Sequence, residues 1–154
     1  MSEIQQPVFG IEKIYVKDLS LEVPGAPQVF MQTEQPQVEV QLEQTSQRVN
    51  EALYEVTLTV TVAAKHGERT LFLVEAAQAG VFQIRNVGEA DLAPVLGVVC
   101  PNILFPYLRE TVSDVINRAG FPPVLLTPVN FEAIYQQRAA EAAAQAGAGI
   151  QIAH

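Results

Sequence analysis

ALYEVTLTVTVAAK, residues 52–65, is the stretch of the sequence that decides the fold. Its hydrophobic and polar side chains alternate, with Val56, Leu58, Val60 and Val62 set between Glu55, Thr57, Thr59 and Thr61. A repeat of two residues is the repeat of a β-strand whose two faces meet different surroundings. The stretch therefore predicts a sheet with one face on a hydrophobic core and one polar face.

Three further segments carry strand patterns. Residues 18–23 alternate in the same way, and so do residues 37–43, in which Val38, Val40 and Leu42 face away from Glu39, Gln41 and Glu43. Residues 70–86 begin with Leu71, Phe72, Leu73 and Val74, which are hydrophobic on both faces. Such a run is typical of a strand that is covered on each side. The four segments together predict a four-stranded antiparallel sheet.

The connections between these segments have their own signals. Gly67 supplies the positive φ that a hairpin turn needs, and residues 45–50 form a second turn. Residues 25–36 are bounded and interrupted by prolines, which predicts a crossover loop between strands that are not hairpin neighbours.

The pattern changes to a helical one in the second half of the chain. Five hydrophobic residues follow the spacing of one helix face: Leu104, Leu108, Val112, Val115 and Ala119. Asn102 is the expected N-cap, Gly120 and Pro122 end the helix, and a second helix begins at Asn130. Strands followed by helices predict an α+β fold with two main helices packed on one face of the sheet.

The chain is long enough for one domain, since it has 154 residues and a mass of 16.8 kDa. We expect a flexible N-terminus over residues 1–8, a folded domain over 9–138, and a low-complexity, disordered tail over 139–154. Charged residues make up only 17% of the sequence, which indicates that other subunits cover part of the surface. The net charge of −8 argues against nucleic acid and anionic lipid as partners.

Cysteine content and segment lengths predict a cytoplasmic protein. Cys100 is the single cysteine and cannot form an internal disulfide, and residues 1–10 lack the basic start and hydrophobic run of a signal peptide. Proline and charged residues interrupt the apolar region at 92–108, so we expect no direct insertion into a membrane.

Catalytic chemistry has little support in the sequence. Cys100 and His66 could form a nucleophile and base, but a cysteine in such an apolar segment is more often a buried hydrophobic residue. His66, His154 and Cys100 offer no spacing for a metal site, and no glycine-rich phosphate loop follows a strand. We therefore expect no enzyme activity, no metal and no cofactor. The acidic side chains of the polar sheet face are either solvated or a docking site.

Four blocks of sequence resemble the SecB family of bacterial protein-export chaperones: residues 14–30 (IYVKDLSLEVPGAPQVF), 53–62 (LYEVTLTVTV), 100–110 (CPNILFPYLRE) and 128–135 (PVNFEAIY). The resemblance implies a homotetramer, built as a dimer of dimers. It also implies ATP-independent binding of unfolded secretory precursors and their delivery to the SecA motor ATPase. An alternative within the same fold is a SecB-like chaperone for a narrower client such as an antitoxin.

The resemblance also implies site residues. The motor-docking residues are Asp18, Glu22, Leu73 and Glu75. The precursor-binding groove is formed by Phe30, Val38, Val40, Leu42, Tyr107, Phe131 and Tyr135, and the tetramer interface by Val74, Ala76 and Gln78. The sequence departs from the family pattern at Glu34, where a groove tryptophan is expected. Its alanine-rich tail also departs from a family tail that makes a second contact with the motor.

Overall fold

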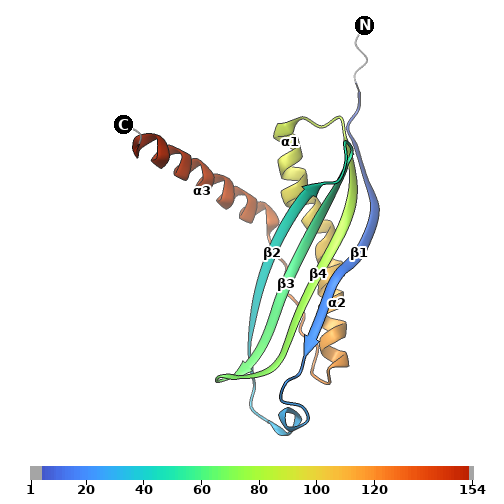
Figure 1. Ribbon diagram of the computed structural model, residues 1–154, viewed down its shortest axis with the longest axis vertical. Coiled ribbons are helices and arrows are strands. Elements are labelled where there is room, and N and C mark those ends of the chain that lie inside the picture. The colour runs from blue at the N-terminus through green and yellow to red at the C-terminus, as the bar shows by residue number, and fades with distance from the viewer. Residues whose placement is uncertain (1–4, 153–154) are drawn as a thin grey trace.

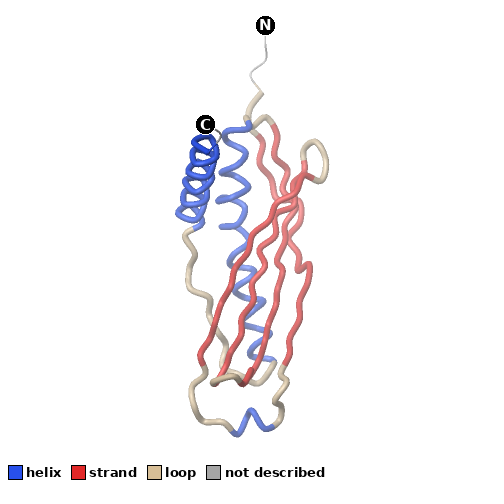
Figure 2. Tube along the Cα trace, turned by 60° about the vertical axis from the view of Figure 1, so that its left-hand side comes forward, coloured by secondary structure: helices blue, strands red, loops and turns tan. Residues whose placement is uncertain are grey.

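The structure is a computed structural model that describes residues 5–152. Four antiparallel strands form one sheet in the order β1-β4-β3-β2: β1 (Val8–Glu22), β2 (Gln37–Arg48), β3 (Leu53–His66) and β4 (Arg69–Arg85). The helices follow in the chain: α1 (Glu89–Pro94), the π-helical turn η2 (Val95–Val99), α2 (Cys100–Arg118) and α3 (Phe131–Ile152). Figures 1 and 2 show α1 and α2 on one face of the sheet. The α+β prediction is confirmed.

The alternation in β3 places its hydrophobic residues under α2, as predicted. Val56, Leu58, Val60 and Val62 are at most 1% exposed, and they pack against the fully buried α2 residues Leu104, Leu108, Val112 and Ile116. The register joins Val60 to Ala76 of β4 and to Leu42 of β2, so one face of the sheet is hydrophobic across its width. We call this face the helix face and the opposite one the outer face.

A β-bulge explains the double-sided hydrophobic pattern at the start of β4. Ala64 of β3 is opposite Phe72, but Lys65 is opposite Thr70, so Leu71 is an extra residue in β4. The bulge turns Leu71 toward the core, where it and Phe72 are 4% and 3% exposed. Leu73 stays partly exposed on the opposite face, so the cover predicted for that side, by a helix or by another subunit, is not supplied by a helix of the protomer.

The hairpin at Gly67 and the crossover loop are confirmed, while the turn predicted over residues 45–50 lies later, because residues 45–48 belong to β2. Gly67 has a φ of 62° in the β3–β4 hairpin, and β2 ends before a short turn over residues 49–52. Residues 23–36 cross from β1 at one edge of the sheet to β2 at the other, and they include the 3₁₀ turn η1 (Gln28–Met31). Figure 2 shows this crossover loop at one end of the molecule.

The first long helical segment starts much earlier than predicted. Helical structure begins after Gly88 and runs without a break from Glu89 to Arg118, so Asn102 is not its N-cap. Pro101 has no N–H for the carbonyl of Gly97 four residues before it, and that carbonyl accepts a hydrogen bond from Gln44 Nε2 of β2 at 3.2 Å. The sheet therefore satisfies a backbone group that proline leaves without a donor.

The 30 residues of this helical segment are long and apolar enough to cross a membrane by length and composition alone. Proline and charged residues interrupt the segment, as predicted, but these interruptions alone do not exclude a span by length and composition. The stripe of α2 that faces β3 and β4 is nevertheless fully buried in the protomer. The feature is weak support for a membrane segment.

The second predicted helix is confirmed at its start and differs at its end. Asn130 Oδ1 accepts a hydrogen bond from the backbone N–H of Ala133 at 3.0 Å, which caps α3. The helix then continues to Ile152, where a disordered tail was expected after residue 138. Alanine has the highest helix propensity, so an alanine-rich segment extends a helix once tertiary contacts have started it. His154 lies outside the described residues.

Candidate functional site

A hydrophobic pocket of about 500 Å³ lies at the crossover-loop end of the molecule. It is lined by the crossover loop, the starts of β2 and β4, and the loop after α2: Val29, Phe30, Gln32, Glu34, Gln35, Pro36, Val38, Leu71, Phe72, Gly120, Phe121, Pro122, Pro123 and Val124. We call it the loop pocket. The predicted groove residues Phe30 and Val38 both line it, so this part of the predicted groove is assembled by the fold.

Aromatic contacts hold the crossover loop in place over this pocket. The ring centroid of Phe121 lies 5.3 Å from that of Phe30 and 4.9 Å from that of Phe72. Gly120 has a φ of 93°, and a Cβ at that residue would lie 3.0 Å from the Phe30 ring. The glycine that ends α2 therefore also makes room for the aromatic side chain of the loop.

The helix face of β2 continues the groove from the loop pocket. Val38, Val40 and Leu42 pair with Ala64, Val62 and Val60 of β3 and so share the face on which α2 packs. Helix α2 covers β3 and β4, and Val38 and Val40 remain 43% and 49% exposed. The sheet therefore presents a hydrophobic strip along its edge strand.

A second pocket of about 460 Å³ lies further along β2. We call it the α3 pocket, because the start of α3 lines it together with β2, α1 and η2: Gln44, Thr45, Ser46, Ala93, Leu96, Gly97, Tyr135, Arg138 and Ala139. The predicted groove residue Tyr135 lines it. A Cβ at Gly97 would lie 2.8 Å from Cδ2 of Tyr135, so glycine allows α3 to approach the π-helical turn closely.

Phe131 is not available to a ligand in the protomer. It is 2% exposed, and its ring lies 6.0 Å from that of Phe105 at an angle of 70°. This edge-to-face contact joins the first turn of α3 to α2. The prediction that Phe131 lines the groove is corrected: the residue anchors the helix that forms a wall of the groove.

Tyr107 lies on the β1 side of α2, away from the strip on β2. Thr111 is one turn further along the same side of the helix, and its hydroxyl donates to Gln78 Oε1 of β4 at 3.3 Å. The amide nitrogen of Gln78 in turn donates to the backbone oxygen of Tyr15 in β1 at 3.1 Å. Tyr107 is 47% exposed but does not join Phe30 and Val38 in one groove.

Glu34, at the position where a groove tryptophan was expected, is an exposed part of the loop pocket. Its carboxylate contacts His66 Nε2 of the β3–β4 hairpin, and both side chains are exposed. The contact ties the crossover loop to the end of the sheet. Gln32 Nε2, in the same pocket, is a buried donor without a hydrogen-bond partner among the described residues. Both polar groups are therefore placed where a ligand in the pocket would meet them.

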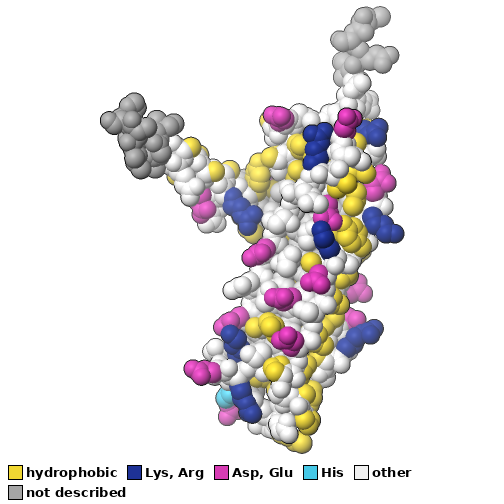
Figure 3. Space-filling model, viewed as in Figure 1, with side chains coloured by type: hydrophobic (Ala, Val, Ile, Leu, Met, Phe, Trp, Pro, Cys, Tyr) yellow, Lys and Arg dark blue, Asp and Glu magenta, His cyan; other side chains and the backbone are white. Residues whose placement is uncertain are grey.

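The four predicted motor-docking residues lie together on the outer face. Glu22 of β1 is opposite Leu73 of β4. Glu75 lies two residues from Leu73 along β4, and Asp18 lies four residues from Glu22 along β1, so the four side chains share one face. Leu73 is partly exposed and the three carboxylates are exposed. Figure 3 shows acidic side chains beside hydrophobic ones on this face. The structure therefore brings the four predicted side chains together on one face of the sheet.

Next to them is a hydrogen-bonded cluster that the sequence did not predict. Glu55 accepts hydrogen bonds from Tyr15 and from Lys17 Nζ, the latter at 2.7 Å. The bonds from Lys17 and Tyr15 lower the pKa of Glu55, while burial and the nearby carboxylate raise the pKa of Tyr15 to about 12. A bulge in β1 makes Lys17 an extra residue, which no alternation pattern indicates.

Val74, Ala76 and Gln78 are buried inside the protomer, with exposed fractions of 0%, 1% and 3%. They lie on the helix face of β4 beneath α2, and Gln78 is hydrogen-bonded to Thr111. The prediction that these side chains contact another subunit directly is therefore wrong. They support α2 from below.

Cys100 is fully buried, and burial raises the pKa of its thiol to about 12. A thiol that keeps its proton is a poor nucleophile, while His66 lies at the exposed β3–β4 hairpin. Among the described residues no group of three or more His, Cys, Asp or Glu side chains could hold a metal ion. The geometry gives the catalytic alternative no support.

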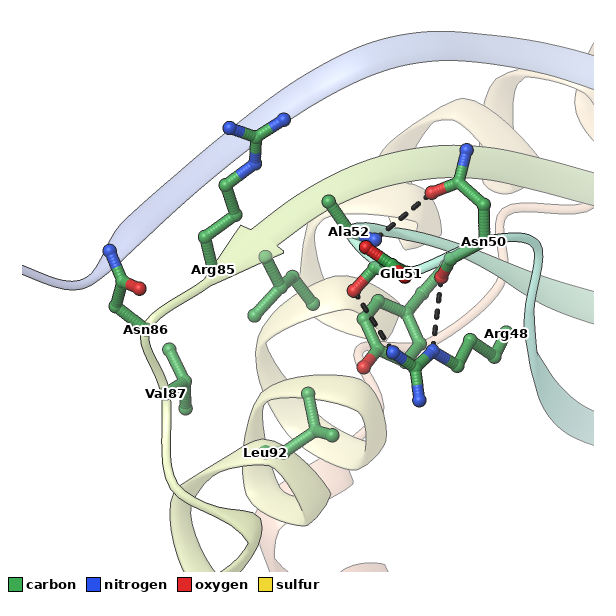
Figure 4. Close-up of a pocket in the computed structure, with 10 residues that line it drawn as sticks. Arg48, Asn50, Glu51, Ala52, Arg85, Asn86, Val87 and Leu92 are labelled. Carbon is green, nitrogen blue, oxygen red and sulfur yellow. Dashed lines mark hydrogen bonds between the residues drawn. The ribbon is translucent and has the colours of Figure 1, made fainter.

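The largest of the described cavities, of about 790 Å³, lies at the other end of the sheet (Figure 4). The guanidinium group of Arg48 donates to the backbone oxygens of Asn50 and Glu51 at 3.0 and 3.2 Å. Asn50 Oδ1 accepts from the backbone N–H of Ala52 at 3.0 Å, and Arg85 points away from Arg48. These polar groups shape the β2–β3 turn, and none of the predicted site residues lines the cavity.

Comparison with known proteins shows the family and agrees with the fold. The family model of SecB, described as a preprotein translocase subunit, matches residues 2–142. The protein-export protein SecB of Chromobacterium violaceum is 64% identical over 145 residues, which cover 93% of this chain and 97% of that protein. The protein-export protein SecB of Dechloromonas aromatica is 59% identical over 152 residues, which cover 99% and 98%.

A solved structure shares the architecture at much lower identity. The SecB-like chaperone of Mycobacterium tuberculosis, in complex with a peptide from an antitoxin, superposes with a TM-score of 0.65 at 18% identity, over 79% of this chain and 90% of that one. At that identity the likeness shows the fold alone, so the antitoxin alternative is not favoured over protein export. The chain belongs to the SecB family, the preprotein translocase subunits that act as chaperones in protein export.

Proposed function

We propose that this chaperone works in the cytoplasm as a homotetramer, a dimer of dimers. It holds unfolded secretory precursors in its grooves without ATP and delivers them to the SecA motor ATPase. The observation that carries the proposal is the open hydrophobic groove, in which Phe30, Val38 and Val40 are 48%, 43% and 49% exposed. A folded protein buries the side chains that fit such a groove, so only unfolded clients can fill it.

The size of the exposed surface supports assembly into an oligomer. The protomer exposes 10261 Å², about 2,700 Å² more than the roughly 7,600 Å² of a typical folded monomer of this mass. A standard interface covers about 800 Å² on each partner, so the excess fits more than one interface. Part of it belongs to α3, which leads away from the sheet in Figure 1.

A second continuous row of exposed hydrophobic residues follows β1. Five residues share the helix face of this edge strand and are between 38% and 49% exposed: Phe9, Ile11, Val16, Leu19 and Leu21. We call them the β1 strip. Tyr107 lies on the side of α2 that faces β1, and it is exposed as well. We propose that another copy of the chain covers the β1 strip, because such a patch is rare on a monomer.

The outer face supports the proposed delivery step. Asp18, Glu22 and Glu75 form a negative surface that steers a basic partner, and burial of Leu73 on contact adds affinity. Lys17 lies beside Asp18, but its ammonium group is held by Glu55 at 2.7 Å. The carboxylates of the docking residues are therefore left to the partner.

Each groove is expected to bind a client loosely. A docked aromatic side chain buries about 150–250 Å², which corresponds to about 4–6 kcal/mol before the cost of ordering the client. Several grooves on one tetramer bind the same long chain together and raise the overall affinity through effective concentration. Loose single sites allow release, while the assembly prevents loss of the client.

The test is an aggregation assay with a denatured secretory precursor, followed by addition of SecA. The chaperone should suppress light scattering without nucleotide, and SecA should then take over the client. Glu75→Lys should keep the suppression and weaken SecA binding by about tenfold, because it reverses a charge at the contact. Glu51→Lys, which changes an exposed acid of the β2–β3 turn, is the control. Absence of suppression overturns the client role, and unchanged SecA affinity removes Glu75 from the docking face.

A further inference from the structure

The groove along β2 has one charged side chain at each end, and the two have opposite signs. Glu34 is the one charged residue among the described residues that line the loop pocket. Arg138 is the one charged residue among those that line the α3 pocket. All the other described residues that line these two pockets are uncharged. The charge that lines the groove therefore changes from negative at the loop pocket to positive at the α3 pocket.

The distance between the two pockets matches a short extended peptide. Val38 lines the loop pocket and Gln44 lines the α3 pocket, and both belong to β2. Six residues of a strand span about 20 Å. Val40 and Leu42 lie between them on the same face. A client segment of about seven extended residues would thus meet both charges and place its hydrophobic centre on the strip.

Both charges are accessible to a ligand. Arg138 has no carboxylate within ion-pair distance in the part of the chain whose side chains are described. The side chain of Glu34 is 67% exposed beside its contact with His66, so a client in the pocket can still reach the carboxylate. Gln32 Nε2 adds a buried donor without a partner to the loop pocket, suited to a carbonyl oxygen of the client backbone.

We propose that Glu34 and Arg138 select client segments with a hydrophobic centre, a lysine or arginine at one end and an aspartate or glutamate at the other. The basic end lies in the loop pocket and the acidic end in the α3 pocket. Each exposed ion pair contributes a small gain, and a like charge at either end contributes a similar loss. The proposal rests on the groove being the client site described above.

The test uses four dye-labelled peptides with the same hydrophobic centre of five residues. Their two ends carry Lys and Glu, Gln and Gln, Lys and Lys, or Glu and Glu. Fluorescence anisotropy at pH 8 and low salt should show tighter binding of the Lys/Glu peptide than of the Gln/Gln peptide. The expected gain in affinity is about two- to fivefold for each of the two charged ends. The two like-charged peptides should bind no better than the Gln/Gln peptide, and about 0.5 M salt should remove the differences.

Charge reversal at one end should change the preference in a specific way. In Glu34→Lys both ends of the groove are cationic, so the Glu/Glu peptide should become the tightest ligand. Glu51→Lys adds the same charge change to the whole protein outside the groove and should keep the preference for Lys/Glu. This control separates a local effect from the general attraction between a protein and an ion of opposite charge.

The outcomes separate this proposal from the function on which it rests. Equal affinity for all four peptides overturns the charge selection while the groove remains the client site. The same holds if Glu34→Lys and Glu51→Lys change the preferences alike. If even the Gln/Gln peptide fails to bind and a groove variant such as Val40→Ala leaves aggregation suppression unchanged, the groove itself is not the client site and both proposals fall.

Discussion

Glu55 connects two strands that are not neighbours, because β4 lies between β1 and β3. Lys17 and Tyr15 of β1 both donate to its carboxylate and lower its pKa from the usual value of about 4.5. A carboxylate with a lowered pKa in the folded state contributes stability above its unfolded pKa. That contribution is lost as the pH falls through the folded value.

Glu55→Gln should therefore lower the free energy of unfolding at pH 7 by about 1 kcal/mol, since a charged hydrogen-bond acceptor is replaced by a neutral one. It should also flatten the loss of stability that the lowered pKa predicts for the native protein as the pH falls below about 4.5. Urea unfolding at pH 7 and at about pH 4 would measure both effects. Glu51→Gln is the control, and a Glu55→Gln protein that keeps the full acid sensitivity would contradict the assignment.

Some residues of the candidate site could be predicted from the sequence, and others could not. Asp18, Glu22 and Glu75 were placed on one face because a strand alternates, and the register of the sheet places them together. Phe131 and Tyr107 were misplaced because an aromatic side chain on a helix fits a core and a groove equally well. Only packing decides, and packing on Phe105 buries Phe131.

The helices differ from the sequence prediction where proline and glycine act through tertiary contacts. Asn102 was the expected N-cap because asparagine favours that position, yet the helix passes through it and through Pro101. The carbonyl of Gly97 accepts a hydrogen bond from Gln44 of β2, a contact between elements far apart in the sequence. Local propensity alone cannot include a donor supplied by a distant strand.

Gly97→Ala should loosen the start of α3, because a Cβ at this residue would lie 2.8 Å from the ring of Tyr135. A rigid aromatic ring at that distance has to move, so we expect a loss of about 1–3 kcal/mol in stability and weaker peptide binding. Thermal unfolding and peptide anisotropy would measure these effects.

Gly88→Ala is the matched control for this change. Gly88 caps the start of α1 with a φ of −66°, and a Cβ there would contact nothing within 4 Å. Equal effects of the two substitutions would show that the close approach of Gly97 and Tyr135 does not matter.

At the scale of the whole molecule, two edge strands leave hydrophobic side chains uncovered. The groove on β2 and the strip on β1 arise because α2 is wide enough to cover only β3 and β4. The alternating pattern of residues 18–23 and 37–43 looks the same whether a helix of the same chain or another molecule covers it. The sequence therefore predicted the sheet faces but not which parts of them stay open.

Leu19→Lys should disrupt the assembly, because it places a charge in the β1 strip. Size-exclusion chromatography with light scattering should show smaller species, and affinity for a long unfolded client should fall much more than affinity for a short peptide. Ser20→Lys is the control, since Ser20 is the next residue of β1 and faces the other way. An intact oligomer in Leu19→Lys, or equal losses for long and short clients, would contradict the avidity argument.

Helix α3 is attached to the molecule by its first turns and extends over 22 residues. At 1.5 Å per residue its length is about 33 Å. A rotation of about 10° around the buried ring of Phe131 would therefore sweep the far end by about 6 Å, while Tyr135, close to the pivot, would shift by only about 1 Å. The helix therefore acts as a lever: a partner bound to its distal end would widen the α3 pocket with little force.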